Sequence, residues 1–157
     1  MNIYIIPSLF ENLVPRKLKI FQAFPCVTIV HEILSHTIGV LVRDQNERNI
    51  CSEILSKDTP IPSIQTKMFK LAEPNQTAVM IEVLEGEDGK HSKDCLTLGH
   101  FELNDLPSRS DLIGRIEVTF TLDNNGLLTA KARDIVSGKE EQMQIDYDTK
   151  TKQADAA

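Results

Sequence analysis

The residues that could carry out chemistry do not converge on a catalytic pattern. His31 and His36 enclose a HEILSH run that is one residue longer than a zinc-protease motif, so on a helix the two imidazoles would lie about 140° apart. The glycines and lysine of residues 86–90 lack the first glycine and the Ser or Thr of a phosphate-binding loop. No Ser/His/Asp or Cys/His set has a local signature. We therefore expect neither catalysis nor a bound metal.

The three cysteines, Cys26, Cys51 and Cys95, are odd in number and far apart in the chain. This spacing disfavours a disulfide framework and favours a reducing compartment. Buried or idle thiols are a better interpretation than a redox role.

The strongest signal is an apolar stretch at residues 68–86. Two extended runs, at 68–71 and 77–84, are joined by a segment in which Pro74 and Asn75 favour a turn, and this predicts a β-hairpin. In the second run Val79, Ile81 and Val83 alternate with residues that are also largely apolar. A strand of this kind either lies between two layers or carries an apolar groove on its outer side.

The elements that must position this stretch are short strands. Residues 116–122 alternate most regularly, which places Ile116, Val118, Phe120 and Leu122 inward, and Asp123–Gly126 then has the Asn-Gly signature of a hairpin turn. Further strands are predicted at 37–43, 50–55, 96–103, 127–133 and 142–147. Close spacing without long helical periods predicts an all-β fold, an antiparallel β-sandwich.

The two ends of the chain differ from this middle part. Residues 8–11 have the spacing of a helix capping box, although Pro15 would end such a helix early, and residues 27–30 suit a strand or an extended linker. The polar tail at 148–157 is expected to be disordered. We expect an N-terminal extension at 1–30, irregular or short-helical, a β-sandwich at 31–147 and the tail at 148–157.

The composition of the chain argues against two kinds of partner, nucleic acid and the membrane interior. The chain has 157 residues, enough for one domain, with 17 basic and 23 acidic side chains and a net charge of −6. Such an acidic chain does not suit nucleic acid, and no apolar run approaches the roughly 20 residues of a membrane span. We expect a cytoplasmic protein, or one of an organelle matrix if the N-terminus, with three basic residues and one acidic residue in its first 24, is a presequence.

Seven motifs resemble, in order and spacing, the seventy-kilodalton heat-shock chaperones (DnaK-like). The resemblance is to the peptide-binding β-sandwich of that family and covers roughly residues 31–147. The motifs are SHTIGV at 35–40, TPIP at 59–62, NQTAVMIEVLEGE at 75–87, LGHFEL at 98–103, IEVTFTLDNNGLL at 116–128, ARD at 132–134 and SGKE at 137–140.

The resemblance implies non-catalytic binding of extended hydrophobic segments of unfolded polypeptides. It assigns a central pocket for one aliphatic side chain to Val40, Val42, Phe69, Val79, Ile81 and Ile116. It places Arg43 and Ala72 in an arch over the client backbone, and Gln76 and Met80 along the channel. Arg43 stands where a bulky apolar residue is common in the family, and a cation there should favour acidic residues flanking the bound segment.

The family's ATPase lobe and helical lid have no counterpart in these residues. The resemblance therefore implies no cofactor in this chain, since ATP binds the ATPase domain of full-length relatives, and it implies that an ATPase domain or co-chaperone would act in trans. The alternative is a degenerate structural or self-association module whose groove is occupied by its own chain, for example by residues 1–24.

Periodicity alone favours plain core positions for Val79, Ile81 and Ile116, and only the resemblance makes them pocket residues. Val83, Val118, Phe120 and Leu128 are assigned to the core in either case.

Overall fold

The computed structural model describes residues 2–4, 28–30, 32–46, 48–110 and 115–147. The chain divides into two compact units, Met1–Glu32 and Ile33–Ala157. In the first unit, β1 (Asn2–Tyr4) pairs with β2 (Thr28–Val30) in an antiparallel ladder. The helix expected at 8–11, the expected disorder at 148–157 and Cys26 lie outside the described residues, and the division at 1–30, 31–147 and 148–157 stays a prediction.

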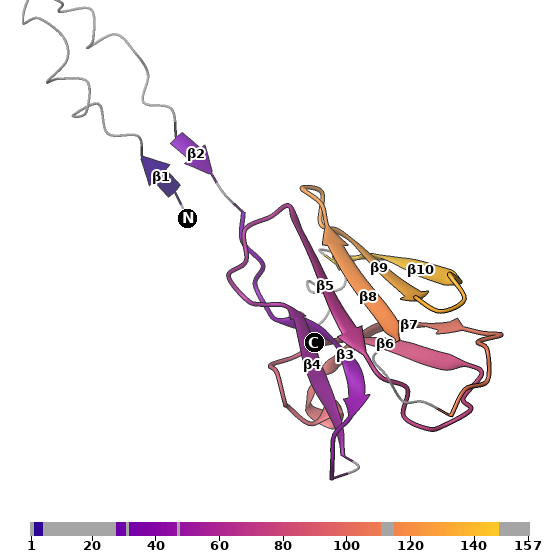
Figure 1. The fold of residues 1–157 in the computed structure, drawn as a ribbon. Helices are drawn as coiled ribbons and strands as arrows, with labels where there is room; N and C mark the ends of the chain where they lie inside the picture. Colours follow the sequence, from indigo (N-terminus) through magenta and orange to yellow (C-terminus); the bar gives the residue numbers. More distant parts are fainter. Residues whose placement is uncertain (1, 5–27, 31, 47, 111–114, 148–157) are drawn as a thin grey trace, which may run out of the picture. The chain divides into compact units, whose positions relative to one another are not determined.

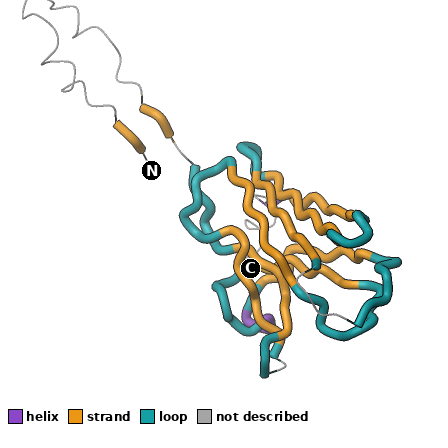
Figure 2. The backbone as a smooth tube through the Cα atoms, viewed as in Figure 1, coloured by secondary structure: helices purple, strands orange, loops and turns teal. Residues whose placement is uncertain are grey.

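The second unit consists of two four-stranded antiparallel sheets, so the predicted β-sandwich class is confirmed (Figures 1 and 2). One sheet has the order β4-β3-β6-β7 and the other β10-β9-β8-β5. The strands of the first are β3 (Ile38–Arg43), β4 (Asn49–Leu55), β6 (Val79–Glu85) and β7 (Leu96–Leu103). Those of the second are β5 (Ser63–Phe69), β8 (Ile116–Leu122), β9 (Leu127–Asp134) and β10 (Glu140–Asp146). A short 3₁₀ turn, η2 (Ser92–Asp94), precedes β7.

The predicted hairpin between residues 68–71 and 77–84 is wrong. β5 pairs with β8 from Ser63↔Leu122 to Phe69↔Ile116, whereas β6 lies in the other sheet between β3 and β7. The turn chemistry itself is present, because Asn75 adopts a φ of 59° and its N–H donates to the Arg109 carbonyl (2.7 Å). The same turn residues serve a crossing from one sheet to the other, and local sequence does not distinguish a crossing from a hairpin.

Strand β8 behaves as its alternation predicts. Ile116, Val118, Phe120 and Leu122 are all buried, and the residues between them are partly exposed. The turn into β9 is closed by Asp123, whose Oδ1 accepts from the N–H groups of Asn125 (2.8 Å) and Leu127 (2.9 Å). Val83 and Leu128 are also fully buried, so all four residues assigned to the core belong to it.

Strand β6 lies between two buried layers over part of its length. Ile81 and Val83 belong to the core between the sheets. A register shift follows Val83, and Leu84 is fully buried without joining that core. Met80, by contrast, is 62% exposed. The first part of β6 therefore borders open space, and this part leads to the candidate site.

Candidate functional site

One pocket of about 780 Å³ gathers all ten residues that the sequence assigned to the pocket, the arch and the channel. It is bordered by the end of β3, the end of β5 with the segment that follows, and the beginnings of β6 and β8. The ten are Val40, Val42, Arg43, Phe69, Ala72, Gln76, Val79, Met80, Ile81 and Ile116. Their role in binding stays a prediction, but the fold brings together residues that are up to 76 positions apart (116 − 40).

The pocket has a buried apolar base and partly exposed apolar walls. Ile116, Val40 and Ile81 are 1%, 3% and 6% exposed, and they come from both sheets. Val42, Phe69 and Val79 pack against the core and keep part of their surface exposed. This arrangement suits one aliphatic side chain that enters from outside, because the apolar walls remove it from water without requiring a polar partner.

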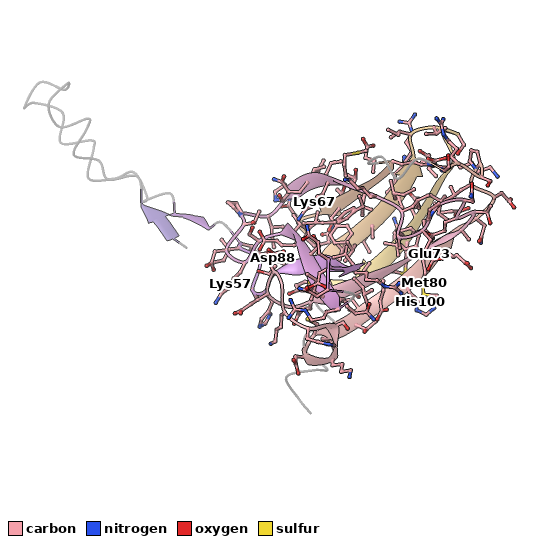
Figure 3. All side chains as sticks on the ribbon, turned by 60° about the horizontal axis from the view of Figure 1, so that its bottom comes forward. Lys57, Lys67, Glu73, Met80, Asp88 and His100 are labelled. Atoms are coloured by element: carbon pink, nitrogen blue, oxygen red, sulfur yellow. The ribbon has the colours of Figure 1, made fainter. Side chains whose placement is uncertain are left out.

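The rim is more polar than the base. Gln76 is already engaged, since its amide nitrogen donates to the Ala78 carbonyl (2.6 Å) and its amide oxygen accepts from the Glu73 N–H (3.3 Å). Its side chain therefore orders the segment after β5 in addition to lining the pocket. Glu73 and Met80 are labelled in Figure 3.

Lys67 is a rim residue that the sequence did not reveal. Its ammonium group reaches from β5 to β4, where it donates to the Ser52 hydroxyl (2.9 Å) and the Glu53 carbonyl (3.0 Å). It also lies 5.9 Å from the centre of the Phe69 ring (Lys67 is labelled in Figure 3). The contact depends on β4 and β5 lying next to each other although they belong to different sheets, and no sequence pattern indicated this.

The charge around the pocket is positive although the chain as a whole is acidic. Arg43, Lys67 and Lys70 line it together with two carboxylates, Asp44 and Glu73. The Asp44 carboxylate is paired with Arg48 (2.8 Å), and hydrogen bonds, first of all from the Arg48 N–H, lower its pKa. The negative charge of Asp44 is thus already compensated.

A buried ion pair supports the pocket wall formed by Phe69 and Ile116. Arg115 Nε lies 2.7 Å from Asp134 Oδ1, and both side chains are almost fully buried. The Arg115 N–H donates to the Phe69 carbonyl (2.8 Å), which fixes Phe69 beside Ile116. Burial acts to raise the pKa of Asp134, but hydrogen bonds from Arg115 and Ser137 outweigh it and hold this pKa far below 3.8. Sequence reasoning placed Asp134 in a motif and missed Arg115.

The described residues contain no group of three or more His, Cys, Asp or Glu side chains that could hold a metal ion. That part of the chain also offers no helix suited to spanning a membrane.

Comparisons with known proteins identify the family of the chain. The family model described as "Hsp70 protein" matches residues 31–157. The chain belongs to the Hsp70 family. A curated relative, the chaperone protein HscA of Buchnera aphidicola subsp. Schizaphis graminum (strain Sg), is 36% identical over 119 residues. That match covers 76% of this chain and 19% of HscA, so the chain spans about a fifth of the length of this relative. The resemblance to the heat-shock chaperones is confirmed.

Proposed function

We propose that this Hsp70-family chain binds extended hydrophobic segments of unfolded polypeptides without catalysis, and that one aliphatic side chain of the client enters the pocket. The observation that carries the proposal is an open pocket of about 780 Å³ with Val40, Ile81 and Ile116 at its base. A volume of this size lies within the roughly 300–1,000 Å³ of ligand sites. No cofactor is needed for this step, and any control by ATP would come from an ATPase domain or a co-chaperone.

The energies favour weak binding of many different sequences. Burying one leucine side chain contributes roughly 1.5–3 kcal/mol, and each main-chain hydrogen bond contributes about 0.5–1.5 kcal/mol net. About five such bonds together with the pocket approach the ~8 kcal/mol of a micromolar complex before ordering costs are subtracted. Because the extended backbone is common to all clients, only the central side chain is selected strongly.

The rim adds a preference for charge. Arg43 and Lys70 are exposed, and Lys67 is held by the neutral Ser52 hydroxyl and a carbonyl that leave its charge uncompensated. We therefore propose that clients with acidic residues beside the central aliphatic residue bind more tightly than clients with basic ones. The preference should weaken as salt screens the charges.

The direct test uses a labelled seven-residue peptide with a central leucine, followed by fluorescence anisotropy and by NMR shifts of Val40, Phe69, Val79 and Ile116. Val79→Phe fills the pocket from its partly exposed wall, so it should reduce affinity at least tenfold. Val136→Phe is the matched control, because Val136 is 46% exposed and does not line the pocket. Unchanged affinity in Val79→Phe would contradict the proposal.

The alternative of a self-association module is tested with the same preparation. A groove filled by the chain itself predicts that the measured size depends on concentration, or that removal of residues 1–26 increases peptide affinity. If the chain stays monomeric and the leucine peptide binds equally well with and without residues 1–26, the binding proposal is favoured.

A further inference from the structure

Two cysteines that are 44 positions apart (95 − 51) lie close together, and neither of them lines the pocket. Cys51 is opposite Leu41 in the β3–β4 pair, and it is fully buried without belonging to the core between the sheets. The segment at 86–95, here called the strap, covers it. The strap is held by two main-chain bonds, from the Cys51 N–H to the Lys90 carbonyl (2.9 Å) and from the Gly89 N–H to the Cys51 carbonyl (2.8 Å).

A third bond fixes the strap beside the cysteine. The Glu53 N–H donates to Asp88 Oδ1 (2.8 Å; Asp88 is labelled in Figure 3). Bonds on both sides of Cys51 leave the strap little freedom to move sideways along β4. Cys95, at the end of the strap, is therefore held in place over Cys51.

The two sulfur atoms both lie next to Gly86. The Cys51 thiol donates to the Gly86 carbonyl (3.5 Å), and the Cys95 thiol donates to the His91 carbonyl (3.5 Å). The two thiols are close enough for each to affect the pKa of the other. A Cβ atom added at Gly86 would overlap the Cys95 sulfur, so glycine at this position leaves the space that the sulfur occupies. Both cysteines are free thiols, which makes them a preformed dithiol.

We propose that Cys51 and Cys95 are an oxidation site that forms an intramolecular disulfide by exchange with a low-molecular-weight disulfide such as oxidised glutathione. The Cys95 thiolate, which is partly exposed, attacks one sulfur of glutathione disulfide, and the other sulfur leaves as glutathione thiolate. The Cys51 thiolate then attacks the Cys95 sulfur of this mixed disulfide and releases the second glutathione. Two thiol protons pass to water, and two electrons pass to the glutathione pair.

The surroundings of the thiols set the rate of this reaction. Burial raises the pKa of Cys51 to about 12, helped by Cys95, Asp88 and Glu53. The pKa of Cys95 is also raised, chiefly by burial. The nearby Lys90 charge acts against this rise, and the Asp94 charge adds to it. Because the thiolate is the attacking form, oxidation should be slow at neutral pH and should accelerate as the pH rises.

The test uses the full chain with Cys26→Ser, so that the third cysteine cannot compete. After incubation with oxidised glutathione at mildly alkaline pH, free thiols are alkylated and the protein is analysed by intact mass and by peptide mapping. The expected product has lost two hydrogens, resists alkylation and yields a peptide in which Cys51 is linked to Cys95. The glutathione adduct at Cys95 is an intermediate, and it should convert fully to this product as the incubation continues.

Two matched variants in the same background, Cys51→Ser and Cys95→Ser, separate the steps. Cys51→Ser should stop at the glutathione adduct, and Cys95→Ser should react at least tenfold more slowly than the parent chain. A persistent adduct in the parent chain, or a disulfide between two chains, would overturn the proposal. So would a Cys51–Cys95 link that forms only in denaturant. None of these outcomes depends on peptide binding, so they leave the proposed function untouched.

Discussion

The two ends of the sandwich are built differently. At the closed end, Ile38, Leu55 and Leu122 are at most 1% exposed and belong to the apolar core. At the pocket end, Val42, Phe69 and Val79 keep part of their surface exposed. Polar links lie beside them, namely the Arg115–Asp134 pair and the contact from Lys67 to β4. Because the chain's own side chains leave this pocket unfilled, polar contacts take part in supporting its walls.

The largest effect is expected at the closed end. Phe120→Ala removes a fully buried ring and should lower the free energy of unfolding by about 3–5 kcal/mol, because the lost burial and the new cavity add together. Urea unfolding followed by circular dichroism measures it. Thr121→Ala, on the partly exposed face of the same strand, is the control and should cost less than about 1 kcal/mol. Equal losses would mean that the closed end is not held by packing.

The next effect tests the polar support of the pocket end. Asp134→Asn leaves the Arg115 charge buried without its counter-charge and should lower the free energy of unfolding by about 3 kcal/mol. The control is Glu140→Gln, which breaks the exposed pair with Lys131 (2.7 Å) and should change stability little.

The Arg115–Asp134 pair should also make the free energy of unfolding depend on pH. The pKa of Asp134 is depressed in the folded chain, so its contribution is fully present above the ordinary value of 3.8 and is lost as the pH falls towards the folded pKa. The stability difference between the natural chain and Asp134→Asn should therefore narrow progressively below pH 3.8. A difference that stays constant on acidification would show that the Asp134 charge does not carry the effect.

The smallest effect is expected at the link between the sheets. Lys67→Met keeps the apolar stem over Phe69 but removes the bonds to Ser52 and Glu53, and it should lower the free energy of unfolding by less than about 1 kcal/mol. Hydrogen exchange of the β4 and β5 amides should nevertheless become faster at this end of the sandwich. A loss as large as that of Phe120→Ala would mean that the pocket end relies on one exposed cation.

Features that depend on residues close together in the sequence could be predicted. The alternation of β8 and the Asp123 turn specify their own structure, so Phe120 and Leu122 could be assigned to the core from sequence alone. The six pocket residues were assigned only through the family motifs, and for Val79, Ile81 and Ile116 periodicity alone favoured core positions.

What could not be predicted depends on contacts between distant segments. The residues around Pro74 and Asn75 suit a hairpin and a sheet crossing equally, so the hairpin was predicted wrongly. The role of Lys67 depends on β4 lying beside β5, and the role of Arg115 depends on its bond to the Phe69 carbonyl. The thiol pair forms only when the strap folds over Cys51. Each of these contacts joins segments whose spacing in the sequence carries no periodic signal.

The uninterrupted register of β8 limits how the length of this chain can vary. All seven residues of β8 are paired on one side with β5 and on the other with β9, with no bulge in either ladder. One inserted residue would turn Phe120 towards solvent and break both ladders at once. Insertions and deletions should therefore be tolerated at the β3–β4 turn and excluded from β8, and a library of single-residue insertions selected for folding would display this as a gap over residues 116–122.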